Sequence, residues 1–291
     1  MRRTLRQICC SAAAAAAAAI VAGCGSGGSA GGSGAPVANS AHGGGQTSLA
    51  PRQVERLALP AHVQVRTVRV PILTYHRVHL FATELHKSIL DLTIEPAAFA
   101  AELDALAAGG YHTITQAQLF HALFDGAPLP SRPVLISVDD GYVDDVTNIL
   151  PQLRRRHMVA TFYVITGRFH EQGFLNEAQV RELDDAGMDI GAHSRTHVPL
   201  NAIPTAQMVS EIPGSRRDLQ RVLGHFVYFF AYPYGAYNAA VLAEVRKAGF
   251  LLATTTAGGT TETSSAPLVM PRIHVGRTAT PASVLASVRG G

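Results

Sequence analysis

The sequence predicts an α/β fold, a distorted (β/α) barrel whose strands run parallel. From about Pro60 onward, short apolar runs alternate with segments that have the 3.6-residue period of a helix. Strands separated by helices pair in parallel, and seven or eight of them in about 230 residues fit a barrel. A doubly wound open sheet is the alternative architecture. The predicted strands are 70–75, 111–114, 133–138, 159–165, 188–192, 226–231, 250–254 and 269–275.

Helix ends are readable between these strands. Pro96 suits the first turn of a helix that Gly109 and Gly110 would stop. Two capping boxes predict helix starts, one at Thr115 with Gln118 and the other at Asn176 with Gln179.

Composition excludes a disordered polymer, because 47% of the 291 residues are hydrophobic and only 15% are charged. The formal net charge of +3 arises at the N-terminus, where Arg2, Arg3 and Arg6 stand in the first 23 residues without any acid. The rest of the chain is balanced and has no basic patch, so no nucleic acid partner is expected.

The N-terminus resembles a bacterial lipoprotein signal over residues 1–23. A basic start, a short alanine-rich apolar run and small residues before Cys24 are typical of export and of acylation at that cysteine. Ordinary signal cleavage beside a chance cysteine is the alternative. Residues 24–59 then predict a flexible Gly/Ser/Ala-rich tether, and 60–291 the folded domain. We expect a protein anchored to the bacterial envelope by lipid, at the outer membrane facing the periplasm.

Polar side chains follow four of the predicted strands. His76 comes after the first strand, and Asp139 and Asp140 come after strand 133–138. His193 follows strand 188–192, and the segment 232–235 follows strand 226–231. The carboxyl ends of barrel strands share one face, which is where active sites of such barrels lie. We therefore expect these residues to meet in one active site.

Asp139 and Asp140 are strand neighbours, so their side chains should start on opposite sides of the strand. That arrangement does not suit the paired carboxylates of a glycosidase, which flank one bond at a set separation. One carboxylate on a metal and its neighbour near the bound water is a better use. A simple turn at DDG is the alternative.

His193 and His197 have the HxxxH spacing that places two imidazoles together if the segment coils for one turn. With Asp140 they make a two-nitrogen, one-carboxylate set that leaves open positions on zinc. The same ligand types form the facial triad of iron(II) oxygenases, which we rank second because the predicted fold is β/α.

The motifs SVDDG, HSRTH and YPYG, in this order, resemble the first three motifs of the polysaccharide deacetylases, carbohydrate esterase family four. The resemblance runs from about Pro71 to Val275. It implies Asp139 as catalytic base, a divalent metal on Asp140, His193 and His197, and the Tyr234 backbone N–H as a donor to the oxyanion. Zinc is the first expectation, with cobalt or nickel compatible with the same ligands.

Departures from the family pattern indicate which subgroup of the family the chain resembles. Ala231 stands where most members have an arginine that orients the base, and the chain has no Trp for the family's later Asp and Trp motif. Arg272 is a candidate replacement for that arginine. His274 is a candidate acid, but ILTYHRV resembles the permuted poly-N-acetylglucosamine deacetylases of biofilm synthesis, which implies His76 as the acid instead.

The resemblance implies metal-dependent hydrolysis of N-acetyl groups from an N-acetylglucosamine polysaccharide, with release of acetate. Poly-N-acetylglucosamine is the expected polymer, although peptidoglycan and chitin carry the same group. The alternatives are an O-acetyl esterase on another glycan and a non-catalytic glycan-binding protein that retains the fold.

Overall fold

The computed structural model describes residues 54–84 and 87–290. The expected signal 1–23, Cys24 and most of the expected tether lie outside these residues. Leu57 belongs to the predicted tether range but is buried in the core, so the packed part of the chain begins before residue 60.

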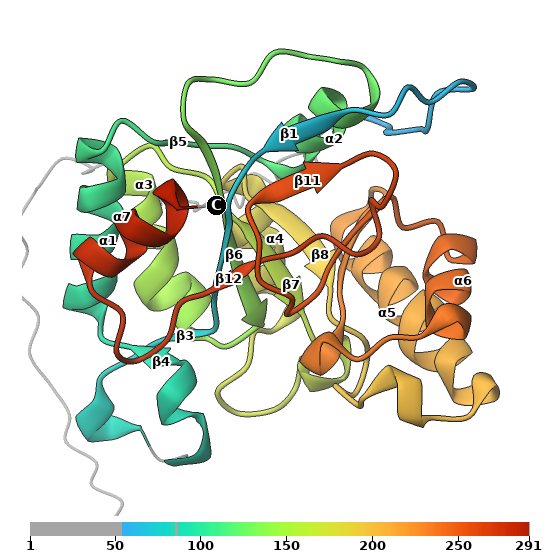
Figure 1. Ribbon diagram of the computed structural model, residues 1–291. Helices are drawn as coiled ribbons and strands as arrows, with labels where there is room; N and C mark the ends of the chain where they lie inside the picture. The colour runs from blue at the N-terminus through green and yellow to red at the C-terminus, as the bar shows by residue number, and fades with distance from the viewer. Residues whose placement is uncertain (1–53, 85–86, 291) are drawn as a thin grey trace, which may run out of the picture. The chain divides into compact units, whose positions relative to one another are not determined.

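The main sheet is parallel, and most of its neighbouring strands are also consecutive along the chain (Figure 1). Its strands run in the order β10-β9-β8-β7-β6-β2-β12, and β5 pairs with the start of β6. They are β2 (Ile72–Tyr75), β5 (His112–Thr113), β6 (Pro133–Asp140), β7 (Thr161–Val164), β8 (Asp189–Ala192), β9 (Phe229–Ala231), β10 (Leu252–Thr254) and β12 (Ile273–His274). Seven of the eight predicted strand ranges contain one of these strands, and β6 extends two residues beyond the eighth, 133–138.

The sheet curls back on itself, which confirms the distorted (β/α) barrel. An isolated parallel bridge joins Thr254 of β10 to Met270, just before β12, and β12 pairs with β2. A doubly wound open sheet would instead reverse its strand order at a switch point. Small pairs lie off this sheet, formed by β1 (Thr67–Arg69) with β11 (Thr261–Thr263) and by β3 (Arg77–Val78) with β4 (Thr93–Ile94).

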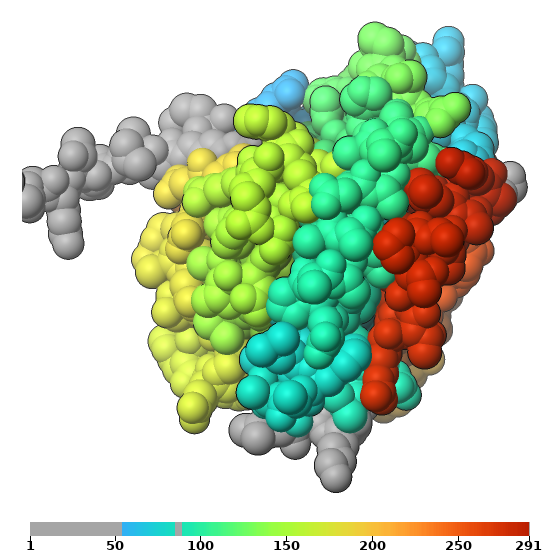
Figure 2. Space-filling model, turned by 90° about the vertical axis from the view of Figure 1, so that its left-hand side faces the viewer, coloured from blue at the N-terminus to red at the C-terminus, as the bar shows by residue number. Residues whose placement is uncertain are grey.

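Helices cover the outside of the sheet. Figure 1 shows α1, α3 and α7 on one side and α5 and α6 on the other, and Figure 2 shows α7 in red beside α1. The helices are α1 (Pro96–Ala108), α2 (Gln116–Phe124), α3 (Leu150–Arg155), α4 (Glu177–Asp185), α5 (Thr205–Leu223), α6 (Ala239–Lys247) and α7 (Pro281–Arg289). None of the helices in the described residues has the length and hydrophobicity needed to span a bilayer.

The predicted helix ends are confirmed. Pro96 opens α1, which ends at Ala108 before Gly110 in the left-handed conformation. In both capping boxes, at Thr115 with Gln118 and at Asn176 with Gln179, each side chain bonds the other residue's backbone N–H.

Both faces of the central strands are buried. In β6, Val134, Ile136 and Val138 belong to the larger core cluster, whereas Leu135 belongs to a second cluster on the opposite face. Such strands read as continuous apolar runs in the sequence, as VLISV does. The polar residues at their carboxyl ends are therefore held by a rigid sheet.

Candidate metal centre

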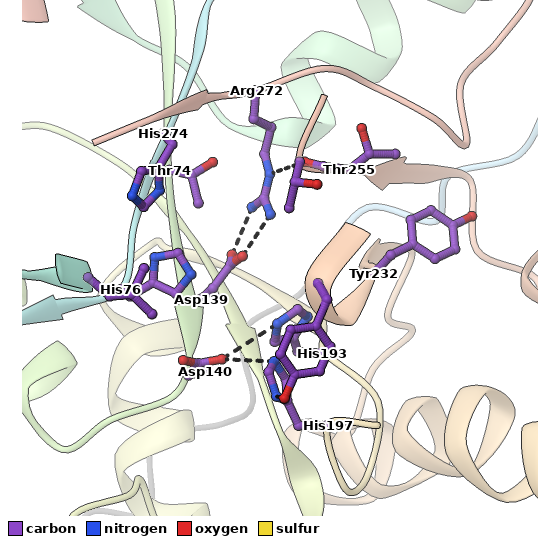
Figure 3. A pocket seen from close by; sticks show the side chains of 13 residues that line it. Thr74, His76, Asp139, Asp140, His193, His197, Tyr232, Thr255, Arg272 and His274 are labelled. Atoms are coloured by element: carbon purple, nitrogen blue, oxygen red, sulfur yellow. Dashed lines mark hydrogen bonds and ion pairs between the residues drawn. The ribbon is translucent and has the colours of Figure 1, made fainter. Parts of the chain in front are cut away.

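The residues expected at the strand ends converge on one pocket (Figure 3). This cavity of about 250 Å³ lies at the carboxyl ends of β2, β6, β8 and β9. Every residue given a catalytic, metal or supporting role from the sequence lines it. The lining residues are Thr74, His76, Leu92, Asp139, Asp140, His193, His197, Tyr232, Tyr234, Thr255, Thr256, Arg272 and His274.

Asp140, His193 and His197 form the predicted metal-binding group. One ligand atom of each lies within 4.8 Å of the others. The Asp140 Oδ1 atom lies 3.6 Å from His193 Nε2 and 3.4 Å from His197 Nε2. This oxygen is buried and has no hydrogen-bond partner among the described residues. A buried carboxylate oxygen facing two imidazole nitrogens fits a divalent cation.

Asp139 and Asp140, neighbours at the end of β6, both line the pocket. Asp140 has a positive φ of 80°, which departs from ordinary strand geometry. Gly141 follows with φ of 75°, and a Cβ there would lie 3.1 Å from Val164 Cγ1. The DDG segment is thus both a turn and a ligand-bearing segment.

The two histidines reach the site from a tight loop after β8, not from a helical turn. The His193 Nδ1–H donates to the Ala231 carbonyl at 2.8 Å, which leaves Nε2 free to face Asp140. The His197 N–H donates to Ser194 Oγ at 3.0 Å, and the His197 Nδ1 lies 3.1 Å from the Tyr234 hydroxyl. Both rings are therefore fixed by contacts away from the metal-binding nitrogen.

Burial sets the ionisation of the three ligands. It lowers the pKa of His193 to about 3 and that of His197 to about 4, so both rings are neutral at pH 7. Burial, and then the charge of Asp139, raise the pKa of Asp140 to about 7. Neutral imidazoles are ready to bind a metal, and a cation would remove the cost of ionising Asp140.

Arg272 holds the neighbouring Asp139. Its Nη1 and Nη2 atoms donate to the two carboxylate oxygens at 2.8 and 2.7 Å, and Nε donates to the Thr255 carbonyl. Burial raises the pKa of Asp139, but the Arg272 charge and hydrogen bonds, with smaller contributions from His193 and His76, together outweigh it and hold that pKa well below its usual range. Arg272 thus binds Asp139, as we expected of a residue that replaces the arginine missing at Ala231.

His76 and His274 lie together beside Asp139 (Figure 3). Their ring centroids are 5.6 Å apart. Burial lowers the pKa of His76 to about 4, although the charge of Asp139 opposes the change. His76 is therefore neutral at pH 7, a state that the sequence alone does not predict. His274 is more exposed, at the end of β12.

Tyr234 lies in a short 3₁₀ turn, Pro233–Gly235, directly after β9. Its backbone is left-handed, with φ of 58°, and its side chain stands at the pocket with 64% exposed. Gly235 has φ of 65°, and a Cβ there would collide with Thr256 Oγ1. The YPYG motif therefore specifies the backbone conformation that carries the Tyr234 N–H.

Asp144 supports the His76 segment, and sequence reasoning missed it. Its Oδ2 accepts the Val78 N–H at 2.8 Å, and its Oδ1 accepts from Arg77 Nη2 at 3.1 Å. The sequence did carry a signal, because a second acidic pair follows the first in DDGYVDD.

Comparisons with known proteins agree with this geometry. The polysaccharide deacetylase family model matches residues 126–253. YxkH of Bacillus subtilis, which carries the same family name, is 27% identical over 72% of each chain. The Streptococcus pyogenes deacetylase PplD, solved in complex with acetate, is 25% identical with a TM-score of 0.71, covering 77% of this chain and 99% of its own. IcaB from Ammonifex degensii is 25% identical with a TM-score of 0.66, covering 76% and 96%.

The similarity to YxkH and to PplD extends over 72% and 77% of this chain, and the likeness to PplD includes its fold. The chain therefore belongs to the polysaccharide deacetylase family, and it is a hydrolase that acts on a polysaccharide.

Proposed function

We propose that this protein is a metal-dependent N-deacetylase of an N-acetylglucosamine polysaccharide, with poly-N-acetylglucosamine as the substrate. The observation that carries the proposal is the pairing of an unpartnered Asp140 oxygen and two neutral imidazoles with the Arg272-bound Asp139. Similarity to IcaB, a poly-N-acetylglucosamine deacetylase, supports the choice of polymer, and the early YHRV segment supports assignment to the permuted deacetylases.

Asp140, His193 and His197 would hold the metal, for which zinc is our first choice. When bound, the ion would lower the pKa of a water molecule and polarise the acetamide carbonyl. Three ligands from the chain would leave room on such an ion for water and substrate.

Asp139 is the base in this proposal. Its carboxylate stays ionised because Arg272 neutralises it, and it takes a proton from the attacking water. Attack at the acetyl carbon develops negative charge on the carbonyl oxygen. The Tyr234 N–H stabilises that charge, and one donor of this kind contributes about 3 kcal/mol.

His76 delivers a proton to the leaving nitrogen. Because its pKa is low, it is neutral at rest and becomes a strong acid once it receives a proton. Its position beside Asp139 suits it to carry the proton that Asp139 gains. Cleavage of the C–N bond then gives acetate and a glucosamine unit.

Loss of the metal should abolish acetate release. Chelator treatment, or Asp140→Asn, should lower kcat/KM by at least about 100-fold, because the hydrolytic water is no longer activated. The measurement is acetate released from N-acetylglucosamine oligomers and from acetylated xylan, before and after addition of Zn²⁺ or Co²⁺. Asp104→Asn, at an exposed position on α1, is the control. Full activity after chelation would remove the metal from the reaction.

Arg272→Gln should move the acid limb of the kcat/KM pH profile to higher pH. The reaction needs ionised Asp139, so activity is lost as pH falls through the Asp139 pKa, and loss of the Arg272 charge raises that pKa. Activity at pH 7 should fall at least about tenfold. Arg272→Lys keeps the charge and should leave the limb near its wild-type position. An unmoved limb in Arg272→Gln would exclude Asp139 as the titrating base.

The two candidate acids can be separated by parallel substitution. His76→Asn should lower kcat by about 10²- to 10⁴-fold, the usual contribution of a general acid, whereas His274→Asn should lower it less than about tenfold. Steady-state kinetics on one defined oligomer provide the comparison. The reverse order would assign the acid to His274 and argue against the permuted subgroup.

We also propose that Cys24 is acylated and that the enzyme is exported to the outer membrane, facing the periplasm. The support is the sequence of the first 24 residues. Cells that express the wild type and are grown with labelled palmitate should incorporate the label into this protein, and Cys24→Ser should lose the label and leave the membrane fraction. Equal labelling of both proteins would contradict acylation at Cys24.

A further inference from the structure

The loop that carries His193 and His197 rests on helix α5. One carboxylate on that helix, Glu211, bonds the middle of the loop. Its Oε2 accepts the Arg195 N–H at 3.0 Å and the Thr196 N–H at 2.9 Å, and its Oε1 accepts the Thr196 hydroxyl at 2.7 Å. Glu211 is only 3% exposed, although most of its helix neighbours in sequence are polar or exposed.

These bonds hold backbone in an unfavourable conformation. Ser194 and His197 both have positive φ, 60° and 57°, which non-glycine residues adopt only when their surroundings enforce it. The two N–H groups between them both point to a single oxygen of Glu211. The carboxylate therefore fixes the turn that returns His197 toward Asp140.

A second set of contacts places the Arg195 side chain. Asp218, which lies seven residues after Glu211 on α5, binds Arg195 Nε at 2.6 Å and Nη2 at 2.8 Å. The helix approaches closely at Gly214, where a Cβ would lie 2.8 Å from Arg195 Nε. Because Asp218 neutralises the arginine, Glu211 is left to the loop backbone and the Thr196 hydroxyl.

His193 does not depend on this arrangement. It follows β8 directly, and its ring is oriented by the Ala231 carbonyl of β9. His197, in contrast, has its backbone position set by the loop, with Ser194 Oγ and the α5 carboxylate as anchors. Loss of Glu211 should thus release one metal ligand and leave the other two in place.

We propose that Glu211 is a positioning residue for the metal centre, acting through the 193–197 backbone to set the direction of His197. The inference rests on the proposed metal-dependent function. It predicts that metal affinity, and not only activity, depends on a helix residue that does not itself bind the ion.

The test is a Co²⁺ titration of the metal-free full-length protein, followed by the visible absorption of the bound ion. Glu211→Ala should raise the Co²⁺ dissociation constant by about 10- to 100-fold, as for loss of other groups that orient metal ligands. Glu211→Gln should stay within about threefold of wild type, because its carbonyl can accept both N–H groups and its amide can donate to the Thr196 oxygen. The intensity and position of the Co²⁺ bands should change only in the variants with weakened binding.

The matched control is Glu102→Ala. Glu102 is also a buried helix glutamate, on α1, and it bonds the Tyr75 hydroxyl at 3.1 Å instead of the loop. Its removal should leave Co²⁺ affinity unchanged even where it lowers the thermal stability of the metal-free protein. A role of Glu211 in stability alone would give the two alanine variants the same Co²⁺ affinity.

Glu211→Asp keeps the inference testable if Glu211→Ala does not fold. It retains the charge but is one methylene shorter, so we expect about a fivefold or greater loss of affinity. A folded Glu211→Ala or Glu211→Asp protein with wild-type affinity and spectrum would overturn the positioning role while leaving the proposed function intact. A wild type that binds no Co²⁺ and releases no acetate would overturn both.

Discussion

The site depends on how two adjacent buried carboxylates are neutralised. Asp139 and Asp140 are 2% and 6% exposed, and two charges in such surroundings are costly unless each has a cation. Arg272 bonds both oxygens of Asp139, which keeps that group ionised. No cationic side chain among residues 54–84 and 87–290 bonds Asp140 in this way, and burial, followed by the charge of Asp139, raises its pKa. Arg272 neutralises one carboxylate, whereas the other faces two imidazole nitrogens and is free to take an exchangeable ion, so the two neighbours are suited to different chemistry.

Backbone strain is concentrated in the same place. Of the six non-glycine residues with positive φ in the described chain, Asp140, Ser194, His197 and Tyr234 belong to the three motifs. Such conformations persist only where tertiary contacts enforce them, and here Glu211, Ser194 and the packing around Gly235 do so. The motifs are therefore short because each one specifies a turn as well as a functional group.

The strands and capped helices could be predicted because their signals are local. The capping boxes at Thr115 and Asn176 involve residues three apart, and the meeting of the strand ends follows from parallel pairing. The positive φ of Asp140 could not be predicted, since strand alternation does not anticipate it. The neutral state of His76 was missed for a similar reason, because burial is a property of the assembled pocket. Glu211 gave no signal, being one acid in a polar helix far from the motifs.

The match to the family model covers residues 126–253, which include the candidate metal ligands and Asp139 but not His76, Arg272 or His274. Those three come from β2 and from the segment that ends in β12, strands that pair in parallel although they are nearly 200 residues apart. The register sets Ile273 beside Leu73 and His274 beside Thr74, so closing the barrel brings the two histidines together and lays Arg272 over Asp139. The central motifs can assemble a place for a cation, but the charge that keeps Asp139 ionised is supplied by the closing strand. In the proposed mechanism barrel closure is therefore part of the catalytic apparatus, since an open sheet with the same three motifs would leave Asp139 without the Arg272 guanidinium.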